Sequence, residues 1–339
     1  MRKLRNLVIC MGLTAIMPIN VSISAETTDL NLDINEITIS GLSSGGYMAN
    51  QFHIAHSDWV KGAAIIAAGS YYCAQGSITT ALSECVNKQS SEFSLEPLHT
   101  QLKQYASEGL IAPLSNLQDS RVWLLHGKLD AKISSPVANA LYQQYQGLVS
   151  DKNLTYIKDK PFAHHFPTLS TGSSCDTSES PFLGNCSYDA AGEFLNFLFP
   201  KLNSPNQKSS GTITAINQHK LGGKPAETMA KTGYVYIPKS CAEGQQCQVH
   251  VNFHGCNQNA ETIGQDYIIG NGLNRWADNN QLIVLYPQTS TSMMLPMNPQ
   301  GCWDWWGYTD EKYATTHGKQ IQAVKNIVES LAAQSKSKG

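Results

Sequence analysis

The hydrophobic positions of this chain fall into short apolar runs that alternate with longer amphipathic segments. The runs are rich in Ile, Val and Leu, as buried strands are. They predict strands at Glu36–Ser40, Lys61–Ala68, Arg121–His126, Leu154–Ile157, Thr232–Ile237, Cys247–Phe253 and Leu282–Tyr286. The amphipathic segments predict helices at Gly46–His56, Ser135–Gln146, Asp189–Phe199, Asn271–Asn279 and Lys319–Ala333. Strands that alternate with helices predict an α/β fold, with a mostly parallel sheet and helices on both faces.

The first residues follow another pattern, that of an export signal. Arg2, Lys3 and Arg5 precede the apolar run Leu7–Ile19, and small residues continue to Ala25. This order predicts a signal peptide, residues 1–25, that is cleaved after Ala25. The run is too short to cross a hydrocarbon core of about 30 Å. We therefore expect a secreted protein, extracellular or periplasmic, that does not bind membranes.

Charge narrows the choice of partners. Without residues 1–25 the chain keeps 21 Lys and Arg against 26 Asp and Glu, a net charge of about −5. There is no basic stripe, so nucleic acid and anionic membrane surfaces are poor partners. We expect a monomer. The only linker-like stretch, Lys201–Gly211, divides the chain into two parts that both alternate strands and helices.

Nine cysteines are present, and Cys10 lies in the predicted signal peptide. An even number in an exported chain predicts disulfides. Eight cysteines allow 105 pairings, and the sequence does not choose among them. Pairing between neighbours in the chain is our working hypothesis: Cys73–Cys85, Cys175–Cys186, Cys241–Cys247 and Cys256–Cys302. A zinc site is the alternative, but no tight pair of Cys-x-x-Cys motifs supports it.

A serine motif points to the chemistry. The segment Gly41–Gly45, GLSSG, fits G-x-S-x-G between a predicted strand and a predicted helix. This arrangement is typical of the nucleophile elbow of α/β-hydrolases, with Ser43 as the nucleophile. The backbone N–H of the following residue, Ser44, is then one donor of the oxyanion hole.

A serine nucleophile needs a base, and the base needs an orienting acid. Asp130 follows the predicted strand Arg121–His126, at the sheet edge where the serine lies. His164 and His165 follow the predicted strand Leu154–Ile157 in a loop at the same edge. The order Ser, Asp, His is the one expected on this fold. Placement alone leaves both histidines open as the base.

A second oxyanion donor is expected in a loop after a neighbouring strand. The segment His254–Cys256 follows the apolar strand Val249–Phe253 and suits this role through the backbone N–H of Cys256. In an ordinary α/β-hydrolase, however, this strand precedes the nucleophile elbow. Moving Gly211–Ala333 in front of Glu36 restores the usual order. We therefore infer a circular permutation, with the old ends joined at 201–211.

Seven stretches together resemble the secreted, single-domain, circularly permuted polyhydroxybutyrate depolymerases. They are GLSSGGYMA (Gly41–Ala49), HHFPT (His164–Thr168), NCSYDAAG (Asn185–Gly192), HGCNQ (His254–Gln258), WADNN (Trp276–Asn280), LYPQ (Leu285–Gln288) and GCWDW (Gly301–Trp305). The resemblance covers essentially all of the mature chain. It implies a three-layer α/β-hydrolase fold, permuted, with residues 26–339 as a single catalytic domain.

The resemblance also implies site residues. It implies Ser43 as nucleophile, Asp130 as acid and His164, rather than His165, as base. It implies Ser44 and Cys256 as oxyanion donors. It further implies that Trp305 lines the substrate crevice, where core packing is the alternative for a tryptophan. No cofactor or metal is implied, and the substrate is a polyester or a short ester.

Parts of the sequence differ from the family that the motifs resemble. Trp306–Tyr308, Pro113–Gln118 and Thr291–Pro299 depart from the family pattern, which leaves polymer specificity open. Two other functions are therefore kept: a feruloyl or acetyl esterase acting on plant-wall esters, and a non-catalytic secreted binding protein on a hydrolase scaffold. His53 and His56 have a spacing that could suit a metal, but no acidic third ligand is evident, and we interpret them as ordinary helix residues.

Overall fold

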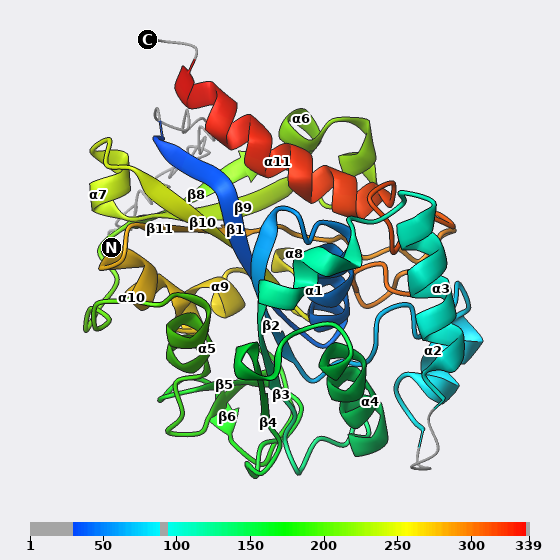
Figure 1. Cartoon of the computed structure of the whole chain (residues 1–339). Helices are drawn as coiled ribbons and strands as arrows, with labels where there is room; N and C mark the ends of the chain where they lie inside the picture. Colours follow the sequence, from blue (N-terminus) through cyan, green and yellow to red (C-terminus); the bar gives the residue numbers. More distant parts are fainter. Residues whose placement is uncertain (1–29, 89–93, 337–339) are drawn as a thin grey trace, which may run out of the picture.

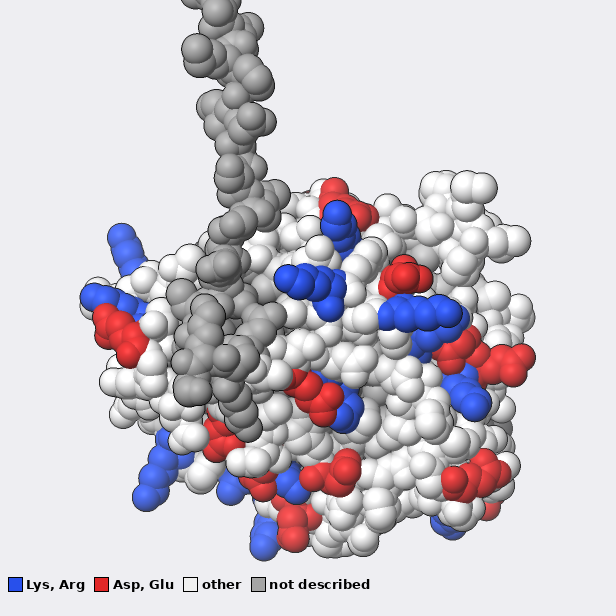
Figure 2. Space-filling model, turned by 90° about the horizontal axis from the view of Figure 1, so that it is seen from above, with Lys and Arg blue, Asp and Glu red and all other residues white. Residues whose placement is uncertain are grey.

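The computed structural model describes residues 30–88 and 94–336 (Figure 1). The predicted signal peptide and its cleavage after Ala25 lie outside these residues. Of the helices within the described ranges, none is long and apolar enough to cross a membrane. On the face seen from above, basic and acidic side chains are interspersed, so neither sign forms a continuous field there (Figure 2).

The centre of the molecule is an eight-stranded sheet with the order β4-β3-β2-β1-β10-β11-β9-β8 (Figure 1). From β4 to β11 neighbouring strands are parallel, whereas β9 and β8 form an antiparallel edge. The strands are β1 Leu32–Leu42, β2 Val60–Ile66, β3 Arg121–Leu125, β4 Leu154–Ile157, β8 Thr212–Asn217, β9 Thr232–Ile237, β10 Cys247–Phe253 and β11 Leu282–Tyr286. Every strand predicted from an apolar run is present.

Helices cover both faces of this sheet, which gives three layers (Figure 1). Side chains alternate across a strand, and in β3 Val122 and Leu124 enter one apolar cluster whereas Trp123 and Leu125 enter the other. The first cluster includes side chains of α1 Ser44–Ala55, α3 Glu96–Ser107, α4 Ser135–Gln146 and α11 Lys319–Lys336. The second includes side chains of α5 Ala190–Leu198, α9 Asp266–Gly270 and α10 Leu273–Asp278. The predicted three-layer α/β-hydrolase fold, mostly parallel with helices on both faces, is confirmed.

Shorter elements decorate this core. A small parallel sheet joins β5 Phe166–Thr168, β7 Leu183–Asn185 and β6 Ser173–Ser174. The remaining helices are α2 Ile78–Glu84, α6 Gln218–Gly222, α7 Lys239–Ala242 and α8 Ala260–Ile263, with 3₁₀ turns at Leu114–Asp119, Asp151–Asn153 and Lys224–Thr228. Strand β5 begins directly after His165, so its pairing with β7 anchors the C-terminal end of the segment that holds His164 and His165.

The eight cysteines of the described residues form four disulfides. The pairs are Cys73–Cys85, Cys175–Cys186, Cys241–Cys247 and Cys256–Cys302, which are the pairs expected from neighbours in the chain. Three of them close short loops, since they join residues 12, 11 and 6 positions apart. The fourth joins the end of β10 to the segment after β11 and therefore lies at the sheet edge of the predicted site.

The strand order bears on the inferred permutation. Strand β10 lies next to β1 and parallel to it, with Gly41 opposite Phe253. The loop after β10 is thus brought to the nucleophile elbow although it follows in the sequence. This adjacency is what the permutation requires, and the permutation itself remains a prediction.

Candidate active site

Ser43 occupies a sharp turn between β1 and α1. Its backbone is in a strained region, with φ 58° and ψ −122°, of the kind found at functional sites. A side chain at Gly41 would meet the carbonyl oxygen of Gly45 at 2.1 Å, and one at Gly45 would meet that of His254 at 2.3 Å. The turn can therefore close only because both positions are glycine, which is the physical content of the G-x-S-x-G pattern.

Asp130 is held in the loop after β3. Its side chain is fully buried. One oxygen, Oδ1, accepts hydrogen bonds from the backbone N–H groups of Lys132 and Ile133, at 2.8 and 2.9 Å. Burial raises the pKa of Asp130, but the neighbouring His164 and these amides lower it more, so the net pKa lies below its ordinary value. The carboxylate stays ionised at neutral pH.

His164 meets this carboxylate directly. Its Nδ1 lies 2.8 Å from Asp130 Oδ2. Because an ionised carboxylate only accepts, Nδ1 carries the proton and Nε2 of the neutral ring is left as an acceptor. That tautomer is the one a general base for serine needs. Among the described residues no hydrogen bond joins Ser43 to the ring, and such bonds often form only with substrate bound.

His165 is placed differently. Its Nε2 donates to the carbonyl oxygen of Cys175 at 2.8 Å, and its Nδ1 is buried without a partner. The ring packs against Gly184, where an added side chain would lie 2.0 Å from it. Of the two candidate histidines, only His164 is brought to Asp130.

The loop His254–Cys256 lies beside the elbow, since a side chain at Gly255 would contact Ser43 Cβ at 3.4 Å. Nδ1 of His254 donates to the carbonyl oxygen of Gly255 at 2.7 Å, and Nε2 accepts from the backbone N–H of Thr289 at 3.3 Å. Burial lowers the pKa of His254 to about 4, so this ring is neutral. The disulfide Cys256–Cys302 fixes the end of the loop.

Gln258 was not singled out by itself from the sequence, although it ends the HGCNQ stretch. Its Oε1 accepts from the backbone N–H of Gly255 at 2.6 Å. Its Nε2 donates to the carbonyl oxygens of Pro181 and Phe182. Gln258 therefore joins the loop His254–Cys256 to the segment before β7, and the signal for it was its place in the family motif.

The aromatic segment after Cys302 is largely buried. Trp303 is fully buried, whereas Trp305 is 7% exposed and stacks on Tyr47 at 4.2 Å between ring centroids. The carboxylate of Asp304, which sequence reasoning passed over, accepts hydrogen bonds from the backbone N–H groups of residues 307, 308 and 309. It thereby fixes the turn that carries Trp306. Trp305 as a substrate contact remains a prediction.

Two histidine groups could be taken for metal sites. The ligand atoms of His165, Cys175 and Cys186 lie within 4.8 Å of one another, but both cysteines are consumed by their disulfide. His53 is buried in α1 and its Nδ1 bonds to the hydroxyl of Tyr145 at 3.0 Å, as expected for an ordinary helix residue.

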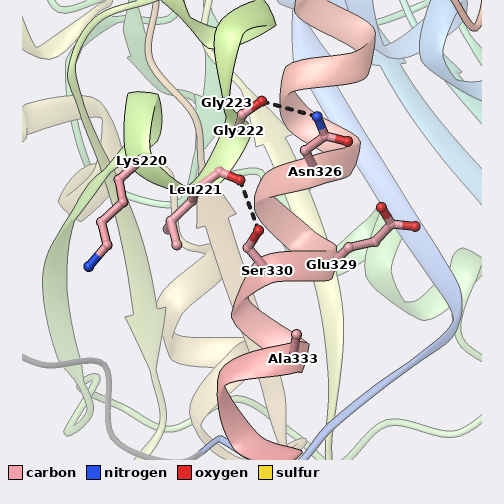
Figure 3. Close-up of a pocket in the computed structure, with 8 residues that line it drawn as sticks. All are labelled: Lys220, Leu221, Gly222, Gly223, Asn326, Glu329, Ser330 and Ala333. Carbon is pink, nitrogen blue, oxygen red and sulfur yellow. Dashed lines mark hydrogen bonds between the residues drawn. The ribbon is translucent and has the colours of Figure 1, made fainter. Parts of the chain in front are cut away.

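An open pocket of about 380 Å³ lies between α6 and α11, away from these groups (Figure 3). Two of its polar side chains are already used, since Asn326 donates to the carbonyl oxygen of Gly222 and Ser330 to that of Leu221. None of the candidate catalytic residues lines it. We assign no function to this pocket.

Comparison with known proteins gives a consistent result. A family model described as esterase PHB depolymerase matches residues 232–339. A poly(3-hydroxybutyrate) depolymerase of Delftia acidovorans is 38% identical over 307 residues, which are 90% of this chain and 61% of that protein. A polyhydroxybutyrate depolymerase of Talaromyces funiculosus is 34% identical over 317 residues, 89% of this chain and 91% of that one. The chain thus spans less than two thirds of the Delftia protein.

Solved structures agree. The crystal structure of a PHB depolymerase from Penicillium funiculosum and a serine-to-alanine variant of a PHB depolymerase complexed with an R3HB trimer both superpose with a TM-score of 0.84. Each is 32% identical and covers 91% of this chain and 99% of the other. Sequence and fold agree over nearly the same length, and we conclude that the chain belongs to the polyhydroxybutyrate depolymerase family of carboxylic ester hydrolases.

Proposed function

We propose that this chain is a secreted serine esterase that hydrolyses poly(3-hydroxybutyrate) or its oligomers through an acyl-enzyme. The observation that carries the proposal is the hydrogen bond between Asp130 and His164 at the sheet edge where the strained Ser43 turn lies. The named substrates of the relatives supply the substrate class. Export, with cleavage after Ala25, and action as a monomer are parts of the same proposal.

In the proposed reaction, the Ser43 hydroxyl attacks the ester carbonyl as Nε2 of His164 removes its proton. Asp130 stabilises the imidazolium that forms, and His164 then returns the proton to the leaving alcohol. A water molecule, activated by the same ring, attacks the acyl-enzyme and releases the acid. The backbone N–H groups of Ser44 and Cys256 stabilise the oxyanion, and Trp305 contacts the substrate. No cofactor enters these steps.

The test compares substrates and one variant. We expect the protein to release 3-hydroxybutyrate or its short oligomers from the polymer, with little turnover of methyl ferulate. Ser43→Ala should lower kcat by a factor on the order of 10⁶, as in the best-studied triad. Preference for ferulate or acetylated sugar would favour the plant-wall esterase, and failure of a serine-directed phosphonate to label the protein would favour a binding protein.

The choice of nucleophile has a matched control. Ser44 lies next to Ser43 but is buried, and its Oγ accepts a hydrogen bond from the backbone N–H of Trp303 at 3.4 Å. Ser44→Ala keeps the backbone N–H that the oxyanion hole needs, so we expect a much smaller loss. If Ser44→Ala abolishes activity and Ser43→Ala does not, the assignment is wrong.

A further inference from the structure

Strands β1 and β10 bury polar side chains at the centre of the main sheet. On the face covered by α5, α9 and α10, the neighbouring strands β2 and β11 contribute apolar side chains such as Ile66 and Val284. Strands β1 and β10 place four polar residues on the same face, each at most 6% exposed: Thr38, Ser40, His250 and Asn252. We call these four residues the β1–β10 network. Buried polar groups are costly unless they are hydrogen-bonded, so these residues need partners inside the sheet.

The residues of the network are one another's partners across the two strands. Nδ1 of His250 lies 2.8 Å from Thr38 Oγ1, and its Nε2 lies 2.7 Å from Ser40 Oγ. Nδ2 of Asn252 donates to the same Ser40 Oγ at 2.7 Å. Burial lowers the pKa of His250 to about 3, and the neutral ring offers one donor and one acceptor nitrogen to the two hydroxyls. The network therefore ties β1 to β10 through side chains, in addition to the backbone ladder.

The backbone ladder is interrupted directly before the network. Asp33 pairs with Gln248, and the next pair is Thr38 with His250, so residues 34–37 of β1 lie opposite Val249 alone. The pairing of β1 with β2 also shifts at this point. The ladder before such an irregularity does not fix the register after it. The first pair after it, Thr38 with His250, is a pair of the network.

Apolar patterning alone does not fix the register here either. A shift by one residue would turn the polar side chains into the opposite layer and is excluded. A shift by two residues keeps every side chain on its own face, since side chains alternate along a strand. It would, however, separate Ser40 from Asn252, which are paired in the sheet and joined by a hydrogen bond. The network therefore distinguishes registers that the apolar residues do not.

This register sets the geometry of the candidate active site. Strand β1 ends at Leu42, directly before Ser43, and β10 ends at Phe253, directly before the loop His254–Cys256. A shift by two residues would move one strand end by about 6.6 Å relative to the other. An oxyanion donor must lie within about 3 Å of the oxygen it stabilises. The distance from Ser43 to the predicted donor on Cys256 thus depends on how β1 and β10 are aligned.

We propose that the β1–β10 network is a positioning device for the proposed reaction. It fixes the strand that carries the nucleophile against the strand that carries the predicted oxyanion donor. Its four residues are buried in the sheet and act through the two strand ends, so they are positioning residues and not catalytic ones. The inference rests on the proposed function, because it takes the roles of Ser43 and Cys256 from there.

The first test removes one hydroxyl and separates kcat from KM. Ser40→Ala takes away the group that bonds both His250 and Asn252. Because an oxyanion donor acts mainly in the transition state, kcat on a soluble 3-hydroxybutyrate ester should fall about tenfold or more, with KM within twofold. The controls are Ile39→Val and Ile39→Ala, on the same strand but in the other apolar cluster. They should lower Tm and leave kcat unchanged, and unchanged kcat in Ser40→Ala would overturn the proposal.

A conservative pair of variants tests the hydrogen bond itself. Thr38→Val keeps the shape of the side chain and removes its hydroxyl, whereas Thr38→Ser keeps the hydroxyl and removes a methyl group. We expect Thr38→Val to lower kcat and Thr38→Ser to retain most of it. Equal losses of kcat in the two variants would assign the effect to packing and contradict the proposal.

Inhibition by an alkyl boronic acid reports on the oxyanion site more directly. The boron accepts an electron pair from Ser43 Oγ, the hydroxyl proton passes to His164, and the tetrahedral adduct places a boron-bound oxygen where the oxyanion would lie. In Ser40→Ala the inhibition constant should rise by about the same factor as kcat falls, and in Ile39→Val it should not change. A wild-type inhibition constant in Ser40→Ala would contradict the role of the network.

Amide hydrogen exchange separates this proposal from the proposed function, because it needs no catalysis. At equal Tm, residues 40–44 and 251–256 should exchange faster in Ser40→Ala than in an Ile39 variant. If the wild type hydrolyses no ester but this difference is present, the proposed function fails and the alignment of the strands by the network stands. If esters are hydrolysed and Ser40→Ala matches the wild type in kcat and in exchange, the network fails and the proposed function stands.

Discussion

Asp130 shows how single residues set this site. Its carboxylate uses one oxygen for two backbone N–H groups and the other for His164. The hydrogen bonds from the two backbone N–H groups fix the orientation of the carboxylate. The hydrogen bond of the other oxygen fixes the orientation of the His164 ring. His126 Nδ1 lies 3.8 Å from the same oxygen as His164, and burial lowers the pKa of His126, so that ring stays neutral. The charge of Asp130 is therefore available to the imidazolium that would form on His164 in the proposed reaction.

Asp130→Asn tests this arrangement. The amide can still accept from the backbone N–H groups of Lys132 and Ile133, so the fold should be retained. Its NH₂ would donate to the histidine ring and favour the wrong tautomer, and kcat should fall by a factor on the order of 10⁴. The measurement is kcat on a soluble 3-hydroxybutyrate ester, with Tm as the control. Loss of Tm in proportion to activity would indicate a structural role only.

Substitutions of the two adjacent histidines should differ in their effects on kcat and Tm. His164→Ala should reduce kcat by several orders of magnitude with a small change in Tm, because the ring is the proposed base. His165→Ala removes the hydrogen bond to Cys175 and leaves a cavity beside Gly184, so its main effect should be a lower Tm. Both variants are assayed on the same soluble ester. A larger kcat loss for His165→Ala would reverse the assignment.

Four buried histidines predict the acid sensitivity of the fold. Burial lowers the pKa of His53 and His250 to about 3 and of His56 and His254 to about 4. The unfolded chain, with a histidine pKa near 6.5, binds more protons below that pH, so stability should be full above about pH 6.5 and fall as pH drops toward 4. Each ring contributes up to about 1.4 kcal/mol per pH unit.

The free energy of unfolding in urea at pH 8, 7, 6 and 5 checks this prediction. His53→Gln should lower stability at pH 8, where all four rings are neutral, yet give a shallower decline toward pH 5. A decline as steep as that of the wild type would show that His53 does not contribute, and a flat profile in the wild type would contradict the idea as a whole.

At the scale of elements, what the sequence could predict depends on burial. The central parallel strands are apolar along their whole length, and the predicted ranges match β2, β3, β10 and β11 to within a few residues. The antiparallel edge strand β8 was missed because only two of its side chains are buried, in the alternating sequence TITAIN. Helix α3 was missed for a similar reason, since it buries only Leu98 and Leu102. The local hydrophobic pattern of an element is weaker when the element buries few side chains in the core.

The residues of the candidate site also differ in how far local sequence patterns could predict them. The elbow was predicted from the G-x-S-x-G motif between a strand and a helix. Asp130 was predicted from its place at a strand end, because parallel strands present their carboxyl ends at one edge of the sheet. The choice between His164 and His165 needed the family resemblance, since both follow the same strand. The part played by Gln258 depends on a contact with Pro181, 77 positions away, and no local pattern encodes such a contact.

The disulfide at the loop His254–Cys256 leads to a prediction at the scale of elements. Cys256–Cys302 joins residues 46 positions apart, and Cys241–Cys247 joins residues 6 apart. On the chain-entropy account, removing them as C256S/C302S and C241S/C247S costs about 4 and about 2 kcal/mol. Only the first pair should also lower kcat, because only that bridge holds a predicted oxyanion donor. Equal effects of the two variants on kcat would contradict this role.

At the scale of the whole molecule, one sheet carries groups from both halves of the chain. Ser43, Asp130 and His164 come before residue 200, whereas the loop His254–Cys256 and the aromatic segment come after it. The pairing of β1 with β10 brings the halves together. Helix α11 packs against β1, and its C-terminal end lies on the side of the molecule where β1 begins (Figure 1). The candidate active site therefore depends on the sheet as a unit.

The proposed join at 201–211 is more firmly attached than a loose linker. Asp278 at the end of α10 accepts hydrogen bonds from the backbone N–H groups of Ser210 and Gly211. Asn203 exchanges hydrogen bonds with Asn280. These contacts hold the connector on the surface of α10. They predict that cutting the connector lowers stability modestly and leaves the core strands paired.

A re-permuted chain tests the whole arrangement. It begins at Ser210, which keeps the contacts to Asp278, runs to Ala333, continues through a short flexible loop to Leu30, and ends at Pro200. Starting at Leu30 rather than Glu36 is required, because Leu30 is 1% exposed and Leu32 pairs with Cys247. No buried strand loses a partner, so this chain should fold, form its four disulfides and hydrolyse the soluble ester with a kcat near that of the wild type. Its Tm should be lower, because residues 201–209 are left out and their contacts, such as the hydrogen bonds between Asn203 and Asn280, are lost. Insolubility across several loop lengths, while the wild type refolds under the same oxidising conditions, would refute the permutation as a property of this fold.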